Sequence, residues 1–129
     1  MDIINTFKKE LGVKNKQLAK LASKPNCVSS QTESKAKKVR PIQYSVSTTE
    51  QMNKVVSVVS NMPGAQIKQQ TDVYLYAVFT TKIMRFKDDV EIFLDDDAKL
   101  LHYRSASRLG YSDLGVNRKR YNSFASAFN

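Results

Sequence analysis

The apolar residues after Pro41 predict a short strand followed by a helix. Residues 42–46 alternate apolar and polar side chains, which is typical of a half-buried strand. Ser47 followed by Glu50 makes a capping box, in which each side chain satisfies an otherwise unpaired backbone N–H. The helix ends at Pro63-Gly64. Its apolar face consists of Met52, Val55, Val56, Val59 and Met62.

Four strands and a second helix are predicted after that point. The strands are 65–70, 73–79, 83–94 and 99–107, and the second of them is apolar on both faces, as in a covered central strand. The last helix begins at about Gly115 and has an apolar face of Tyr121, Phe124, Ala125 and Phe128. The order β-α-β-β-β-β-α predicts an α+β fold, with a curved antiparallel sheet and helices packed on one face. We expect residues 25–129 to form this single domain.

Strands 83–94 and 99–107 are expected to form a hairpin whose turn is symmetric about Asp96-Asp97. In that register Asp89 lies opposite Arg104 and Glu91 lies opposite His102. Alternation then separates an apolar face from a charged face, and a one-residue slip would misalign the two apolar sets. We therefore expect a shared surface or cleft formed by Asp89, Glu91, His102 and Arg104.

Residues 1–24 are predicted to form a basic amphipathic helical arm. Its apolar positions fall on one stripe of a helix, with lysines off the stripe; they are Ile3, Ile4, Phe7, Leu11, Leu18 and Leu21. Such a helix packs on its own domain, serves as a linker, or lies on an acidic membrane surface through residues 1–22. Residues 23–40 are polar and predict a loop.

Charge is concentrated in the first third of the chain. The 129 residues carry a formal net charge of +9, which invites a nucleic-acid hypothesis. Residues 1–40 hold ten Lys and Arg against three acidic residues, so the remaining segment is nearly neutral. That distribution argues against a basic groove built into the fold, and we do not expect nucleic acid as a partner. Because the start has no apolar export segment, a cytoplasmic location is expected.

Four stretches carry a resemblance to a known family. They are PNCVSSQ (25–31), VRPIQYSVS (39–47), DDVEIFLD (88–95) and RSASRLGYSDLGVNRKRYNSF (104–124). In this order they resemble domain of unknown function 1499, a bacterial and plant family. The resemblance implies one domain over about residues 25–128 and no mechanism. Members often carry an N-terminal membrane or export segment and a further cysteine shortly before the PNC motif, where this sequence has Ala22-Ser23.

The densest polar cluster predicts a site for an anion at a strand-to-helix corner. Guanidinium groups match carboxylate or phosphate geometry, and N–H groups at a helix start add partial positive charge. The candidate ligand-binding residues are Arg104, Ser105, Ser107, Arg108, Ser112, Asn117, Arg118 and Arg120. The alternative is that these donors are consumed by internal ion pairs that lock the corner. The acidic partners would be Asp88, Asp89, Glu91 and Asp113.

An enzyme is the second hypothesis, with a cleft built from Asp89, Glu91, Arg104 and, as a nucleophile, Cys27. His102 is the one imidazole of the chain, and the sequence does not place it beside Cys27. With a single histidine, and with Asp95–Asp97 better interpreted as a solvated turn, neither a metal nor a cofactor is expected. The glycines match no phosphate-binding loop, and no nucleophile elbow is present.

Taken together, these patterns favour a small non-enzymatic binding or accessory domain. Its partner would be a small anion or another protein, recognised at the arginine-rich corner. The two hypotheses separate on geometry, because arginines that are buried and mutually satisfied would form a structural corner and not an open site.

Overall fold

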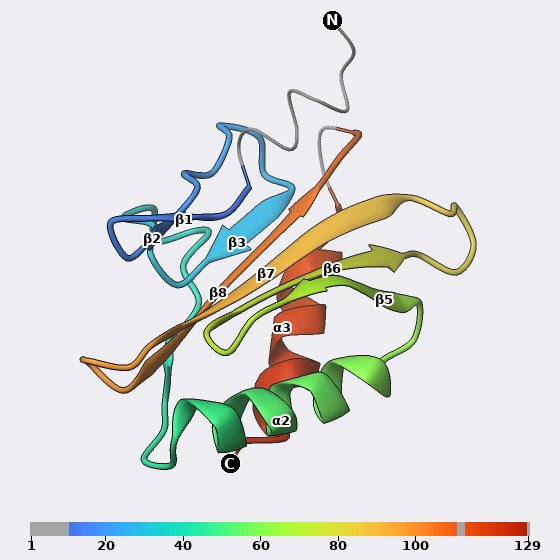
Figure 1. The fold of residues 1–129 in the computed structure, drawn as a ribbon. Helices are drawn as coiled ribbons and strands as arrows, with labels where there is room; N and C mark the ends of the chain where they lie inside the picture. The colour runs from blue at the N-terminus through green and yellow to red at the C-terminus, as the bar shows by residue number, and fades with distance from the viewer. Residues whose placement is uncertain (1–10, 111–112, 129) are drawn as a thin grey trace, which may run out of the picture.

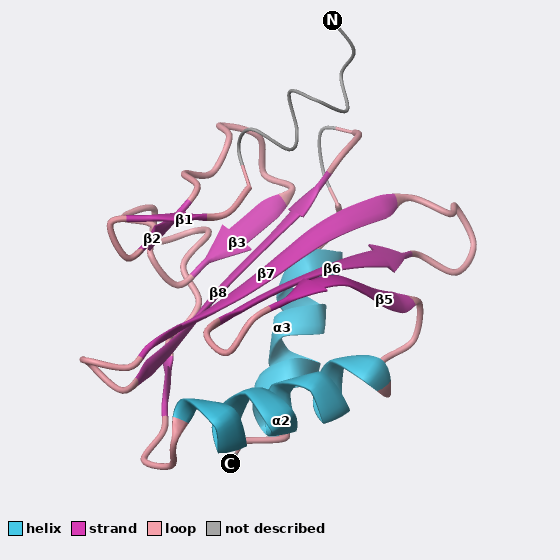
Figure 2. Cartoon of the chain, in the orientation of Figure 1, coloured by secondary structure: helices cyan, strands magenta, loops and turns pink. Residues whose placement is uncertain are grey.

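The computed structural model describes residues 11–110 and 113–128. Within these residues the structure contains a two-stranded sheet, a larger six-stranded sheet and two helices. Figures 1 and 2 show both helices on the same side of the large sheet. In chain order the elements are β1 (Val13–Lys14), β2 (Gln17–Leu18), β3 (Cys27–Ser29), β4 (Ile42–Gln43), α2 (Thr48–Ser60), β5 (Ala65–Gln70), β6 (Tyr74–Thr80), β7 (Lys87–Asp95), β8 (Leu100–Ser107) and α3 (Val116–Ser126).

The large sheet is antiparallel throughout, in the order β3-β8-β7-β6-β5. β4 also pairs with β8, beyond the stretch of that strand that β3 occupies. The three long central strands β6, β7 and β8 come from one continuous stretch of chain. This arrangement confirms the predicted α+β class, with an antiparallel sheet and two helices.

The first helix begins at the predicted cap, and it ends at Ser60, three residues before the predicted stop at Pro63. Ser47 is the N-cap of α2, and its hydroxyl accepts a hydrogen bond of 3.2 Å from the Glu50 N–H. After the helix, Gly64 adopts a φ of +78°, and a Cβ there would come within 2.3 Å of the Thr80 carbonyl oxygen. Only glycine therefore fits this turn, which brings the chain back along β6.

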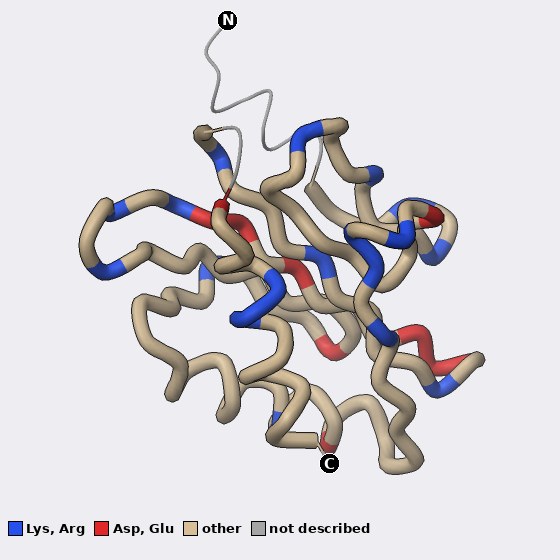
Figure 3. The backbone as a smooth tube through the Cα atoms, turned by 180° about the vertical axis from the view of Figure 1, so that it is seen from behind, with Lys and Arg blue, Asp and Glu red and all other residues tan. Residues whose placement is uncertain are grey.

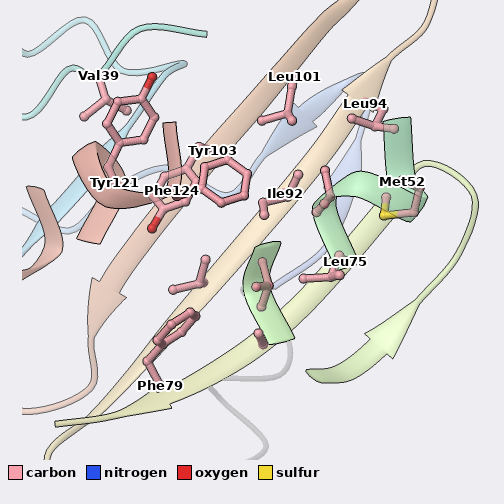
Figure 4. Close-up of a cluster of buried hydrophobic side chains, with 14 of the residues drawn as sticks. Val39, Met52, Leu75, Phe79, Ile92, Leu94, Leu101, Tyr103, Tyr121 and Phe124 are labelled. Carbon is pink, nitrogen blue, oxygen red and sulfur yellow. The ribbon is translucent and has the colours of Figure 1, made fainter. Parts of the chain in front are cut away.

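The main core lies between the helices and one face of the sheet. Met52 and Val55 of α2 and Phe124 of α3 are almost fully buried against Leu75, Ile92, Leu94, Leu101 and Tyr103 of the sheet (Figure 4). Tyr103 meets Tyr121 edge-on, with ring centroids 5.0 Å apart. Because the β-branched residues of α2 give it modest intrinsic propensity, this packing is what holds the helix.

The described part of the predicted helical arm is not helical. Residues 13–18 form a hairpin in which Val13 pairs with Leu18. Its turn has positive φ at Asn15 and Lys16, a conformation suited to tight hairpins and incompatible with a right-handed helix. Gln31 fixes the hairpin, because its side chain accepts from Leu18 N and donates to Lys16 O. The prediction for residues 1–10 lies outside the described residues.

Three further sequence predictions need correction. Residues 83–86, expected to begin the strand 83–94, form a loop before β7. Residues 27–29, expected in a loop, form β3 on the edge of β8. The β7–β8 hairpin is shifted by two residues from the expected register, so that Glu91 and not Asp89 lies opposite Arg104. The turn spans four residues and includes Lys99 at positive φ. A shift of two residues preserves the facing of every side chain, so the predicted charged face persists.

Candidate functional site

The sheet presents different chemistry on its two faces. One face packs under α2 and α3; the other, here called the hairpin face, packs against residues 11–22. Tyr74, Tyr76, Asp89, Glu91 and Arg104 share the hairpin face, as strand alternation and register require. Figure 3 shows acidic positions of the central strands close to a basic position, whereas most Lys and Arg positions lie toward the periphery.

Three side chains form what we call the inner row: Tyr74 of β6, Glu91 of β7 and Arg104 of β8. The Glu91 carboxylate is fully buried and accepts hydrogen bonds from the Tyr74 hydroxyl at 2.6 Å and from the Gly12 N–H at 2.7 Å. Its other oxygen lies 3.5 Å from Arg104 Nη1. Arg104 also donates to the carbonyl oxygens of Ala19 and Lys20. The inner row therefore attaches residues 11–22, which we call the N-terminal hairpin segment, to the sheet.

Burial dominates the electrostatics of the inner row. Loss of hydration raises the pKa of Glu91, although the Tyr74 hydroxyl, the Gly12 N–H and Arg104 all favour the carboxylate. The pKa of Tyr74 is raised as well, first by burial and then by the neighbouring Glu91 charge. The ion pair between Glu91 and Arg104 is long, at 3.5 Å, and it does not compensate for the hydration that the Glu91 carboxylate loses on burial.

The outer row repeats the same chemistry two residues away: Tyr76 of β6, Asp89 of β7 and Arg108 just after β8. Arg108 donates to both oxygens of Asp89, with Nη2 at 2.9 Å and Nε at 3.1 Å from the carboxylate. The Tyr76 hydroxyl donates to Asp89 and accepts from Arg108. About a third of the Arg108 side chain is exposed, compared with 7 % for Arg104. Burial, followed by the Asp89 hydrogen bond, raises the pKa of Tyr76 to about 12.

A groove of about 840 Å³ opens along the hairpin face above the two tyrosines. Its lining is mostly apolar or aromatic, with Lys68 and Arg108 as its charged members and no acidic side chain among the described lining residues. The groove runs between the N-terminal hairpin segment and the β5–β6 edge of the sheet. The lining residues are Leu11, Gly12, Val13, Lys68, Gln69, Val73, Tyr74, Tyr76, Val78, Phe93 and Arg108.

Arg120 and its neighbours lie on the opposite, helix-covered face. Arg120 donates to Asp88 at 2.7 Å, to Asn117 and to Ser105, and its guanidinium stacks over the Phe79 ring. Ser105 in turn donates to the Asn117 side chain, which is fully buried. The second oxygen of Asp88 and the Tyr103 hydroxyl are buried here without a hydrogen-bond partner among the described residues. The sheet thus separates the residues of the predicted corner, with Arg104 and Arg108 on the hairpin face and Arg120 on the helix-covered face.

The remaining corner residues bind the start of α3 and a nearby turn. Asp113 accepts from the backbone N–H groups of Gly115 and Asn117, so a carboxylate of the chain itself occupies the helix N-terminus. Ser107 accepts from Asn117 Nδ2. Arg118 donates to the carbonyl oxygens of Ala36 and Lys38. Ser112 lies outside the described residues.

Within the described residues, the thiol that the enzyme hypothesis takes as nucleophile contacts backbone carbonyl groups and not the imidazole. Cys27 is buried in β3, and its sulfur donates toward the carbonyl oxygens of Lys24 and Ala22. His102 instead contacts Ser30, with 2.9 Å between Ser30 Oγ and His102 Nδ1. Ser30 is buried and also accepts from Tyr103 N, and burial lowers the pKa of His102. Sequence reasoning missed this serine–histidine contact because it depends on β3, which was expected to be a loop.

Within the described residues, no cluster of three or more metal-ligating side chains is found, and no helix is long and apolar enough to cross a membrane.

The fold and the site define a small α+β domain whose polar residues are organised in cross-strand rows. Residues 17–128 match the family described as protein of unknown function (DUF1499), and the chain belongs to that family. The match includes β2 and the Ala19–Lys20 segment that Arg104 binds. Neither the comparison with curated proteins nor that with solved structures gives a match.

Proposed function

We propose that this chain is a small non-enzymatic binding domain that takes an amphipathic anionic ligand in the groove beside the outer row. The rest of the arginine-rich corner is, on this proposal, a structural frame. The observation that carries the proposal is the engagement of the four corner arginines. Each donates to a carboxylate or carbonyl of the chain itself, and of the four only Arg108 lines the groove.

The groove lining supports the ligand class. Val73 is exposed and Leu11 and Val13 are half-buried, so these three side chains offer apolar surface. Such surface gains about 25 cal/mol for each Å² removed from water. Lys68 stands exposed on β5 and supplies positive charge on the lining, whereas the charge of Arg108 is paired with Asp89. The Lys68 ammonium has no acidic side chain beside it among the described lining residues, and it complements an anionic group on the ligand. An apolar chain that ends in a carboxylate or phosphate meets both requirements.

The positions of the catalytic candidates argue for binding and against the enzyme hypothesis. A nucleophile must lie within hydrogen-bond reach of a base in an accessible site. Cys27 and His102 have other partners, and Glu91 is fully buried beneath Tyr74 and Gly12. The groups on which the enzyme hypothesis rests are thus engaged in holding strands and the hairpin segment together.

Thermal unfolding with octanoate, acetate and octanol tests the proposal. Only octanoate combines the apolar chain with the charge, so it should raise the melting temperature most. At ten times its Kd a ligand adds about 1.4 kcal/mol of stability, which corresponds to roughly 4–6 °C for a domain of this size.

Two groove variants sharpen the test. Lys68→Glu reverses an exposed charge of the lining, and Val73→Glu places a carboxylate on its apolar part. Both should abolish the octanoate shift, whereas Lys119→Glu, an equal charge change on the exposed side of α3, should leave it intact. An equal shift with acetate, or an octanoate shift that survives Lys68→Glu and Val73→Glu, would contradict the proposal.

A further inference from the structure

Exposed apolar side chains gather at one end of the sheet. The large hydrophobic residues exposed in the described chain are Val46, Val73, Ile83, Met84, Phe86, Leu109 and Leu114. Five of these seven belong to the β6–β7 loop or the β8–α3 connection. Ile83 is 87 % exposed, and Met84 and Leu109 are exposed by about two thirds or more. Several large apolar side chains exposed on two neighbouring connections indicate a surface that contacts a membrane or another protein.

The two connections leave the sheet at the same end. Asp88 of β7 pairs with Ser107 of β8, and Arg108 N donates to Lys87 O just beyond that pair. In Figure 1 this end lies opposite the β7–β8 turn at the lower left. We call Ile83, Met84, Phe86 and Leu109 the loop patch.

The β6–β7 loop is held in a defined shape by its own hydrogen bonds. Thr81 N donates to Phe86 O at 2.8 Å, Arg85 N donates to Thr81 O at 3.1 Å, and Phe86 N donates to the Thr81 hydroxyl. Arg85 has a φ of +59°, which closes the turn. The backbone polar groups at the base of the loop are therefore paired internally, while Ile83 and Met84 at its tip are directed to the exterior.

Basic residues alternate with the apolar residues of this loop. Lys82, Arg85 and Lys87 lie within 81–87, and that stretch contains no acidic residue. Asp88 and Asp89, which follow, are buried and paired with Arg120 and Arg108. The exposed charge at this end is consequently positive, directly beside the apolar tips.

We propose that the loop patch is a docking surface for an anionic lipid bilayer. Apolar tips flanked by Lys and Arg fit an interface in which the tips enter the headgroup and acyl boundary and the cations remain among anionic headgroups. The cores of protein interfaces are depleted in lysine, so this interleaved pattern favours a bilayer over a protein partner. The proposal concerns a surface distinct from the groove and does not depend on a ligand being bound there.

Cosedimentation of the full chain with vesicles tests the proposal. Binding to phosphatidylcholine vesicles that contain about 30 mol % phosphatidylserine should exceed binding to phosphatidylcholine alone, because phosphatidylserine gives the vesicle a negative surface potential. This binding should weaken with added salt. Ile83→Ser with Met84→Ser should reduce binding about tenfold or more. Lys82→Gln with Arg85→Asn should reduce it about twenty-five-fold, at about fivefold for each charge. Asn suits the left-handed backbone at position 85.

Matched controls separate the patch from general effects. Lys35→Gln with Lys119→Gln removes two exposed charges elsewhere, and Val46→Ser removes an exposed apolar side chain elsewhere. These controls should bind vesicles like the wild type, and thermal unfolding should show that every variant folds. Wild-type binding by the Ile83→Ser/Met84→Ser variant, or no preference for anionic vesicles, would overturn the proposal. Self-association without lipid that this variant abolishes would assign the patch to a protein interface and would overturn it as well.

Discussion

The inner and outer rows each combine a tyrosine, a carboxylate and an arginine on the same face of the sheet, yet they occupy different environments. Glu91 and Arg104 are covered by residues 11–22, whereas Arg108 stands partly in water at the groove. The inner ion pair is long, at 3.5 Å, and the outer carboxylate is held by a two-pronged guanidinium contact. The better-formed pair is thus the more exposed one.

The two rows therefore differ in role: the inner row holds the fold, and the outer row borders the groove. Burying an ion pair costs desolvation free energy, which the surrounding hydrogen bonds must offset. The inner row therefore depends on hydrogen bonds to Tyr74, Gly12 and the carbonyl oxygens of Ala19 and Lys20. The outer row keeps part of its hydration and borders a groove. We therefore expect perturbation of the inner row to affect folding, and perturbation of the outer row to affect mainly the groove.

The largest effect is expected for Glu91→Ala. The variant leaves the Arg104 guanidinium buried without a carboxylate, and breaking a buried pair in this way costs about 3–5 kcal/mol. Chemical denaturation would measure the loss in free energy of unfolding. Glu33→Ala, at an exposed position, should change stability by less than about 0.5 kcal/mol. A loss no larger than in that control would show that the inner row does not hold the fold.

Asp89→Ala, the equivalent change in the outer row, should cost less, about 1–2 kcal/mol. Arg108 is exposed by about a third, so water replaces part of the lost interaction. The same denaturation experiment measures this difference. Equal losses for Asp89→Ala and Glu91→Ala would remove the distinction between the rows.

Deletion of single hydroxyl groups sharpens the comparison. Tyr74→Phe removes a buried hydrogen bond to Glu91 and should cost about 1.5 kcal/mol. Tyr76→Phe removes a half-buried one and should cost about 0.5 kcal/mol, since water can reach Asp89 and Arg108 from the groove. The reverse order of the two losses would contradict the assignment of inner and outer environments.

The smallest expected effect is a pH dependence that belongs to Glu91. Its pKa is raised in the folded state above its usual value of 4.5, so above that pH the unfolded chain loses this proton first. The folded state then binds more protons, and the contribution of Glu91 to stability falls as pH rises toward the raised pKa. Glu91→Gln lacks this titration.

Unfolding of wild type and Glu91→Gln between pH 4 and pH 8 (roughly the range over which a raised carboxyl titrates) measures this effect. The free energy of unfolding of the variant should increase relative to the wild type as pH rises, and then level off. A difference that is constant or falls with pH would mean that Glu91 does not have a raised pKa.

The long central strands of the large sheet and the helices α2 and α3 could be predicted from the sequence because each has a local signal. The Ser47 cap, the Pro63-Gly64 end and the apolar stretch of β6 are all encoded within a few residues. The charged face could also be predicted, because a register shift of two residues does not turn a side chain to the other face. The exact pairing could not, since it depends on the four-residue turn at Asp96–Lys99.

The N-terminal segment shows where local signals fail. Leu11, Leu18 and Leu21 have helical spacing, but Asn15 and Lys16 make a tight turn and Gln31 holds the resulting hairpin. Arg104 then binds carbonyl oxygens of Ala19 and Lys20, some 85 residues away in the chain. Partners at that separation leave no pattern in a single sequence, so the division of the arginines between two faces of the sheet could not be predicted.

The central claim is that the ligand surface is the groove of the outer row and that the other corner arginines are structural. Titration of the isotopically labelled full chain with octanoate, followed by amide chemical shifts, tests it most directly. The account predicts shifts concentrated at Lys68, Gln69, Val73 and Tyr76 around the groove. Shifts concentrated instead at Ser105, Asn117 and Arg120 on the helix-covered face would contradict it.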